Sequence, residues 1–103
     1  MLTRVIVTFD AELWVWDARH ADSWTFVTLP ADASEDIRHI TAGPRRGFGS
    51  VRVRVTVGGT TWATSIFPES GGGGYVLPIK QAVRKAESLD AGDVATVTVA
   101  LMS

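Results

Sequence analysis

The chain has 103 residues, a formal net charge of -1, 46% hydrophobic residues, 20% charged residues and no cysteine. This length suits one domain with a single core, and the composition is that of a globular chain rather than a disordered one. Because cysteine is absent, disulfides, cysteine-ligated metals and thiol catalysis are excluded, and the near-neutral charge gives no general attraction to nucleic acid.

The sequence shows no sign of export or of membrane insertion. Its first ten residues lack the pattern of a signal peptide, and no uncharged apolar run approaches the ~18–20 residues of a membrane helix. We therefore expect a cytoplasmic protein.

The charges are unevenly distributed along the chain. Residues 1–43 carry 3 cationic and 7 anionic side chains, whereas residues 44–103 carry 7 cationic and 4 anionic ones. Two interpretations follow: the two halves attract each other within one fold, or the second half presents a surface to an anion.

The first half of the chain begins with a strand pattern. Residues 2–16 alternate in hydropathy and are rich in β-branched and aromatic side chains, which predicts a long, bent strand. A polar turn over residues 17–22 leads to a second strand over residues 23–29, which Pro30 ends. The two strands are predicted to form a hairpin.

A short surface helix is predicted next, over residues 32–43. Asp32 and Glu35 have the spacing of a capping box, and Ser34 is an alternative cap. Gly43-Pro44 is a typical stop signal.

The second half returns to strands. Residues 48–57 have the clearest alternation in the chain, with valines on one side and arginines on the other. Gly58-Gly59 predicts a tight turn, residues 60–67 return as the second strand of a hairpin, and residues 75–79 form another short strand.

A second short helix is predicted to follow Pro78, which is tolerated just ahead of a helix. Ile79, Val83 and Ala86 have i, i+4, i+7 spacing and would form its apolar face. A Gly-Asp turn then leads into a last strand over residues 94–101.

These elements predict a mainly β fold: a single domain over residues 1–103 that forms a closed β-barrel of about six strands with two short helices. Frequent strands without long helices between them argue against βαβ units. Closure of the barrel would remove the exposed edges of a small open sheet.

Motifs of catalysis are few. His20 and His39 lack the spacing of a zinc site, so no metal is expected. Ser65 lies in the middle of a strand, either as a simple hydrogen-bonding hydroxyl or as a nucleophile. Asp10 and Glu12 share one strand face within ~7 Å, a geometry that suits acid–base work and that solvent-facing strands also have.

Two glycine-containing loops bear on phosphate and nucleic-acid binding. Residues 71–74 are four glycines that lack the Gly-Lys-Ser/Thr ending of a phosphate loop and lead into a strand. Residues 45–49 mix two arginines, a phenylalanine and glycines, as nucleic-acid-binding loops do and as solvated loops also do.

Aromatic and cationic side chains offer a candidate ligand site. Lys80 and Arg84 share one helix face and would attract an anion. Four tryptophans are many for this length, and they either fill the core or line an aromatic pocket. They are Trp14, Trp16, Trp24 and Trp62.

The segment over residues 77–94 resembles part of a known regulator family. Its Leu-Pro-Ile-Lys, its short helix and its Leu-Asp-Ala-Gly-Asp-Val resemble the proline, helix and Gly-Asp box of AbrB-like transition-state regulators and related antitoxins. Those proteins are dimeric DNA-binding barrels with shorter chains. The resemblance implies a related barrel and, as an alternative function, DNA binding by a dimer.

A second resemblance spans nearly the whole chain. The segments Trp-Thr-Phe-Val-Thr-Leu-Pro over 24–30, Gly-Phe-Gly-Ser-Val-Arg-Val over 47–53, Trp-Ala-Thr-Ser-Ile-Phe-Pro over 62–68 and Tyr-Val-Leu-Pro-Ile-Lys over 75–80 resemble a bacterial and archaeal domain-of-unknown-function family. That family occurs alone or ahead of bacteriocin-protection (OmpD-associated) domains. The resemblance implies a fold of the double-split β-barrel class, and it brings no activity, cofactor or catalytic residue.

The leading hypothesis is a non-enzymatic binding module for a small anionic molecule or a peptide, as a monomer or a weak homodimer without a cofactor. One alternative is a dimeric AbrB-like DNA-binding protein. Another is an enzyme that uses Ser65 or the pair of Asp10 and Glu12. The predicted ligand contacts are Trp62, Thr64, Ser65, Lys80 and Arg84.

Overall fold

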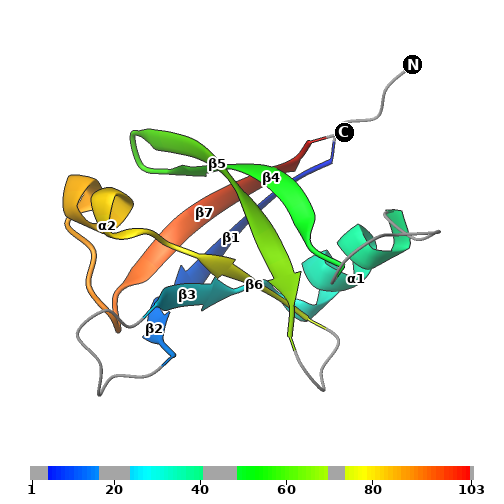
Figure 1. Cartoon of the computed structure of the whole chain (residues 1–103), viewed down its shortest axis with the longest axis horizontal. Coiled ribbons are helices and arrows are strands. Elements are labelled where there is room, and N and C mark those ends of the chain that lie inside the picture. Colours follow the sequence, from blue (N-terminus) through cyan, green and yellow to red (C-terminus); the bar gives the residue numbers. More distant parts are fainter. Residues whose placement is uncertain (1–4, 17–23, 41–48, 70–73, 103) are drawn as a thin grey trace.

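The structure, a computed structural model, describes residues 5–16, 24–40, 49–69 and 74–102 (Figure 1). These residues form seven strands and two helices, so the predicted mainly β class with two short helices is confirmed. In chain order they are β1 (Ile6–Glu12), β2 (Trp14–Val15), β3 (Thr25–Thr28), α1 (Ala31–Ile40), β4 (Val51–Val57), β5 (Thr60–Pro68), β6 (Tyr75–Pro78), α2 (Gln81–Glu87) and β7 (Val94–Leu101).

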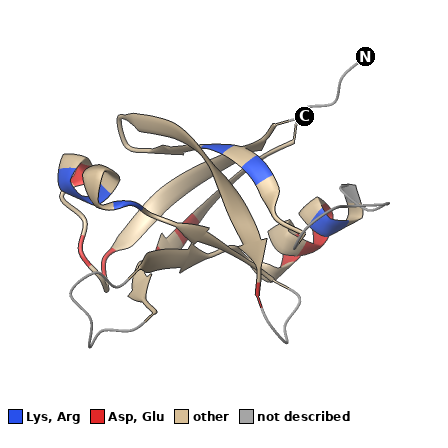
Figure 2. Ribbon diagram, in the orientation of Figure 1, with Lys and Arg blue, Asp and Glu red and all other residues tan. Residues whose placement is uncertain are grey.

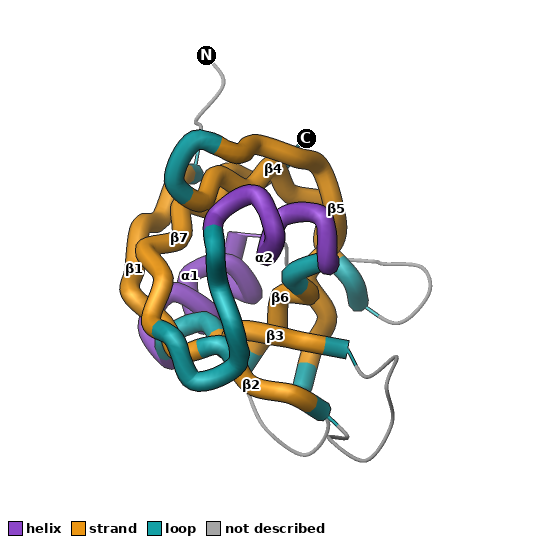
Figure 3. Tube along the Cα trace, turned by 90° about the vertical axis from the view of Figure 1, so that its left-hand side faces the viewer, coloured by secondary structure: helices purple, strands orange, loops and turns teal. Residues whose placement is uncertain are grey.

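The strands form one antiparallel sheet in the order β1-β7-β4-β5-β6-β3-β2. Both predicted hairpins are present. β2 pairs with β3, and β4 pairs with β5 through a turn in which Gly58 has a φ of 58°. The sheet curls around its own interior, as the end-on view shows (Figure 3).

The sheet does not close, and the prediction of a closed barrel is wrong on this point. The predicted first strand is interrupted at Leu13, whose N–H donates to the Asp93 carbonyl at 2.9 Å and whose carbonyl accepts from the Gly92 N–H at 2.8 Å. β1 therefore pairs with β7 while β2 pairs with β3, and no ladder among the described residues joins β1 to β2 or β3. The result is a curled half-barrel of seven strands, and its likeness to the double-split class stays a prediction.

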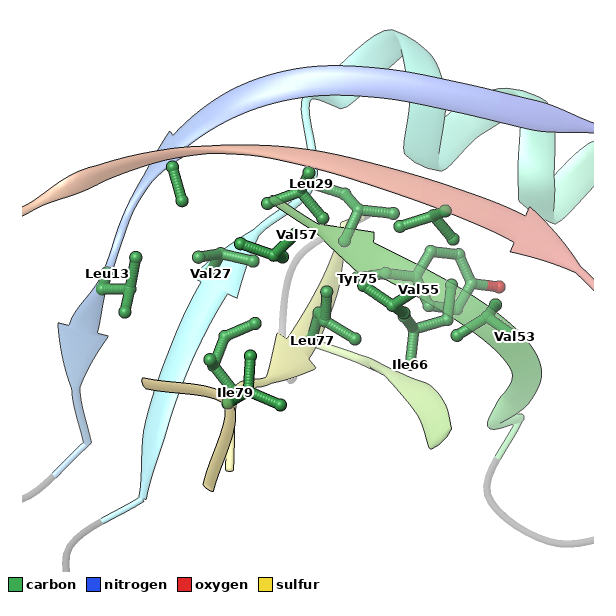
Figure 4. Packing of buried hydrophobic residues seen from close by; sticks show 14 of the residues in the cluster. Leu13, Val27, Leu29, Val53, Val55, Val57, Ile66, Tyr75, Leu77 and Ile79 are labelled. Carbon is green, nitrogen blue, oxygen red and sulfur yellow. The ribbon is translucent and has the colours of Figure 1, made fainter. Parts of the chain in front are cut away.

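Alternate residues of the strands point into the concave side of the sheet and form the core (Figure 4). The predicted alternation of β4 is confirmed, since its four valines are buried while Arg52 and Arg54 are exposed. Burial of a valine or leucine side chain contributes about 1.5–3 kcal/mol, so this cluster dominates the stability of the fold. The other core members include Leu13, Val27, Leu29, Ile37, Ile66, Tyr75, Leu77, Ile79, Val83, Ala95, Val97 and Val99.

The two helices lie at opposite ends of the curled sheet, α1 at one end and α2 at the other (Figures 1 and 3). α1 begins at Ala31, and the Ser34 N–H donates to the Pro30 carbonyl at 2.9 Å. The predicted cap at Asp32 is therefore wrong, because Asp32 lies inside the first turn. Ser34 is fully buried, and its hydroxyl accepts the Tyr75 N–H at 3.1 Å.

α2 follows Pro78 as predicted, with Lys80 as its N-cap residue. Ile79 and Val83 are buried, but Ala86 is exposed, so the predicted apolar face is one residue too wide. The turn after the helix has Gly92 at a φ of 94°, a conformation that glycine adopts without strain.

Candidate functional site

The structure places the three predicted contacts of β5 on two different faces of the sheet. Trp62 lies opposite Val55 on the concave side, half-buried, where it packs against the core. Thr64 lies on the same side, opposite a buried valine of β4. Ser65 is half-buried on the opposite face, beside Arg52. The predicted ligand site therefore combined side chains that point to opposite faces of β5.

The two predicted cations lie at the start of α2. Lys80 is exposed. Arg84 is half-buried, and its Nε donates a 3.2 Å hydrogen bond to the Ile79 carbonyl. Ile79 directly follows the last residue of β6, so this hydrogen bond joins α2 to the end of that strand. One of its donors thus has a structural role that the sequence pattern did not indicate.

The predicted acid pair lies on the outer face of β1. Asp10 and Glu12 are both exposed, and Asp10 Oδ1 accepts a 2.6 Å hydrogen bond from the Thr96 hydroxyl on β7. His39 is exposed on α1, and His20 lies outside the described residues. In the described part of the chain, no group of three or more His, Asp or Glu side chains could hold a metal ion.

The two glycine-containing loops fall largely outside the described residues. Only Gly49 of the arginine-containing stretch 45–49 and Gly74 of the glycine run 71–74 are described. The predictions made for these loops therefore stay predictions.

A group of aromatic side chains covers the outer side of the β2–β3 hairpin. Trp14 lies opposite Phe26, and their ring centroids are 5.1 Å apart. Trp24 stacks on Phe26 with centroids 6.2 Å apart. Trp16 is adjacent to Trp24, because its N–H donates to the Trp24 carbonyl at 3.0 Å and continues the same register. Side chains alternate along a strand, so all four point away from the core.

We call these four residues, Trp14, Trp16, Trp24 and Phe26, the aromatic face. Trp16 is 70% exposed and Trp24 is 63% exposed, whereas Trp14 and Phe26 are half-buried. The indole Nε1 of Trp14 donates to the Thr28 hydroxyl at 2.9 Å, which fixes the orientation of that ring. Trp14 and Phe26 therefore lie on the paired strands β2 and β3, and Trp16 and Trp24 directly follow and precede them.

The aromatic face continues across the neighbouring strands. Val76 of β6 lies opposite Thr28 of β3, and Phe67 of β5 lies opposite Val76, so the three side chains share the outer side of the sheet. Phe67 is 41% exposed. β2, β3 and β6 contain no charged residue and are tan in the charge view (Figure 2). The outcome is a mainly apolar strip that crosses four strands. It is bordered by exposed Lys80, which lies opposite Trp24 because the Ile79 N–H donates to the Thr25 carbonyl at 2.8 Å and continues the β3–β6 register.

The sequence interpretation missed this surface. It expected the tryptophans to fill the core or to line a pocket, and this expectation is wrong for Trp16 and Trp24. The alternation separates Trp24 and Phe26 from Thr25, Val27 and Leu29, but it does not say which of the two sets is buried. The aliphatic set leads into α1 and is buried, which leaves the aromatic set outside.

No helix in the described ranges is long and apolar enough to cross a membrane. No match is found among curated proteins. A family model described as a domain of unknown function (DUF1905) matches residues 9–99. The association with bacteriocin-protection domains and the likeness to AbrB-like regulators stay predictions. The match covers β2 to α2 entirely and most of β1 and β7, and the chain therefore belongs to the DUF1905 family.

Proposed function

We propose that this chain is a non-enzymatic binding module whose ligand is a peptide that lies on the aromatic face. The observation that carries the proposal is the pair of Trp16 and Trp24, adjacent and 70% and 63% exposed. A tryptophan can bury about 150–250 Å², so leaving two in water forgoes much hydrophobic stabilisation. Contiguous apolar patches of this kind mark interaction sites.

The chemistry of the strip supports binding rather than catalysis. β2, β3 and β6 themselves carry no carboxylate, imidazole or amine, and the nearest charged group in the register, exposed Lys80 opposite Trp24, is a cation rather than a paired acid and base. The one phenol in these strands, on Tyr75, belongs to a residue that is buried in the core.

The positions of the predicted contacts favour a peptide over a small anion. Ser65 lies on the opposite face of β5 from Trp62 and Thr64, so the three do not form one site. Arg84 Nε is engaged with a backbone carbonyl. The aromatic face, by contrast, brings four rings together on one side of the β2–β3 hairpin.

The four tryptophans allow a site-resolved test by NMR, because each indole N–H gives its own signal. Trp14, Trp16 and Trp24 report on the aromatic face, and Trp62 reports on the concave side. Single Trp→Phe variants assign the signals. The ¹⁵N-labelled chain is then titrated with an uncharged peptide, an oligosaccharide, oligothymidylate, phosphatidylcholine vesicles and inorganic phosphate.

We expect the peptide to shift the signals of the aromatic face and to leave that of Trp62 in place. The Trp16→Ala and Trp24→Ala variants should weaken this binding about tenfold or more. Ile6→Ala is the matched control, since Ile6 is a 54% exposed apolar residue on β1. The proposal is wrong if the peptide leaves the three signals in place, if only the other probes move them, or if probes move the signal of Trp62 alone.

A further inference from the structure

We infer that the outer face of the β4–β5 hairpin binds a phosphate group, either as the free ion or as an ester. Three side chains form the site: Arg52 and Arg54 of β4 and Ser65 of β5. The inference is independent of the proposed function, because none of these residues belongs to the aromatic face. It assigns an anion site to the second half of the chain, where cationic side chains are in excess.

The register of the sheet brings the three side chains together. Arg52 and Arg54 alternate with buried valines, so both point to the outer face, where both are exposed. Residues two apart on one strand are separated by about 7 Å. Ser65 lies directly opposite Arg52, at a position where Cβ atoms are about 4.5–5.5 Å apart. A single ion on this face is therefore within reach of all three side chains.

The neighbours of the two arginines leave their charges unneutralised. On the outer face, Arg54 lies between Ala63 of β5 and Ala100 of β7. Met102 lies beside Arg52, since its N–H donates to the Arg52 carbonyl at 3.1 Å. β5 and β7 contain no charged residue, and in Figure 2 the blue segments of β4 run between tan strands. Within the described ranges, neither guanidinium forms an ion pair or a hydrogen bond.

The stability of the sheet does not favour this placement of charges. Opposite charges on paired strands stabilise a sheet, whereas two like charges on one face repel each other. The carboxylates of the strands, on Asp10 and Glu12, lie on β1, which β7 separates from β4. The sheet thus holds its two cations side by side and away from its anions. An anionic ligand would supply the missing counter-charge.

The donors of the site select a phosphate rather than a carboxylate. A guanidinium presents its N–H groups in a planar fork that matches two oxygens of either anion. One fork satisfies a carboxylate, whereas a phosphate has further oxygens for a second fork and for a hydroxyl. The Ser65 hydroxyl has no partner in the described part of the chain, so it can donate to the ion. The next hydroxyls along the hairpin, of Thr56 and Thr61, bond to each other at 3.0 Å and mark the end of the site.

The test is an NMR titration of the ¹⁵N-labelled chain that follows the Nε–H signals of the arginine side chains. Single Arg→Met variants assign the signals. The probes are inorganic phosphate and O-phosphoserine, with sodium chloride and sodium acetate at the same ionic strength as controls. We expect both phosphate probes to shift the signals of Arg52 and Arg54 to saturation. The signal of Arg38, an exposed arginine of α1, should stay in place.

Substitutions test the individual contacts. Arg54→Met should raise the Kd for inorganic phosphate about threefold to tenfold. Arg54→Lys should also raise it, because lysine keeps the charge and lacks the planar fork, and this variant serves alone if Arg54→Met lowers the far-UV circular dichroism. Ser65→Ala should raise the Kd by a smaller factor. Arg38→Met is the matched control and should leave it unchanged.

Four results would overturn the inference. They are the absence of shifts at Arg52 and Arg54 with both phosphate probes, equal shifts with chloride or acetate, parallel shifts at Arg38, and an unchanged Kd in both Arg54 variants. A lower Kd for O-phosphoserine than for inorganic phosphate would identify an ester as the ligand, and any other order the free ion. Either order retains the site.

The indole signals separate this inference from the proposed function. The Trp62 ring lies on the concave side of β5, and the aromatic face belongs to β2, β3 and the residues beside them. Inorganic phosphate should therefore leave all four indole signals in place while it shifts those of the two arginines. Because each proposal has its own signals, the failure of one leaves the other intact.

Discussion

The Thr60 hydroxyl donates a 2.6 Å hydrogen bond to Glu87 Oε2, which joins the start of β5 to the end of α2. The same carboxylate lies over the β4–β5 turn, where a Cβ added to Gly58 would come 2.0 Å from Glu87 Oε1. Glycine at this position therefore serves two purposes. It adopts the φ of 58° that the turn requires, and it leaves room for the carboxylate.

Gly58→Ala should destabilise the fold. The positive φ costs about 1–2 kcal/mol for a residue with a Cβ. The displaced carboxylate also loses its bond to Thr60, which adds about 1 kcal/mol. Urea denaturation measures the sum, and Gly59→Ala is the control, since its Cβ would meet nothing within 4 Å.

A double-mutant cycle separates these two contributions. Thr60→Val removes the hydrogen bond in advance, so Gly58→Ala in that background should cost only the backbone part, about 1–2 kcal/mol. An equal cost in both backgrounds would show that the new methyl group leaves Glu87 in place.

Local patterns in the sequence were sufficient for most elements of the fold. In β4, each valine alternates with a polar residue, so the pattern alone identifies the buried face. The tight turn at Gly58 and the helix after Pro78 also follow from local chemistry. Each of these features depends on residues that are close together in the chain.

The features that sequence reasoning missed depend on distant residues. The interruption at Leu13 arises from hydrogen bonds to Gly92 and Asp93, about 80 positions away in the chain. Ala86 is small enough to be tolerated on either side of a helix, so spacing could not show that it is exposed. The aromatic face was missed because both sides of β3 carry apolar residues, and only packing selects which side is buried.

β7 offers a matched pair of substitutions that tests the position of the core. Val97 is fully buried and Val94 is 63% exposed. Val97→Ala removes buried methyl groups and leaves a cavity, so it should cost about 2–3 kcal/mol in the free energy of unfolding. Val94→Ala should change it by about 0.5 kcal/mol or less. Similar costs for the two variants would contradict the register of β7.

The buried hydroxyl of Ser34 should be important for the start of β6. Ser34→Ala removes the acceptor of the Tyr75 N–H and leaves that donor buried and unpaired, at a cost of about 1–3 kcal/mol. The Tyr75 amide should also exchange its hydrogen faster, which NMR detects at this one site. Asp36→Ala on the exposed side of α1 is the control and should leave that exchange rate unchanged.

Arg84 should act on stability rather than on anion binding. Arg84→Met keeps the apolar stem of the side chain and removes the donor to the Ile79 carbonyl, so the free energy of unfolding should fall by about 1 kcal/mol. Lys85→Met on the exposed side of α2 is the control and should have little effect.

The same variant tests the predicted anion site at Lys80 and Arg84. A ligand that binds only the folded state raises the melting temperature by mass action. Because Arg84 Nε already donates to a backbone carbonyl, inorganic phosphate should shift the melting temperatures of the original chain and of Arg84→Met equally. A phosphate-dependent rise that Arg84→Met abolishes would instead restore the small-anion hypothesis and place its ligand at the start of α2.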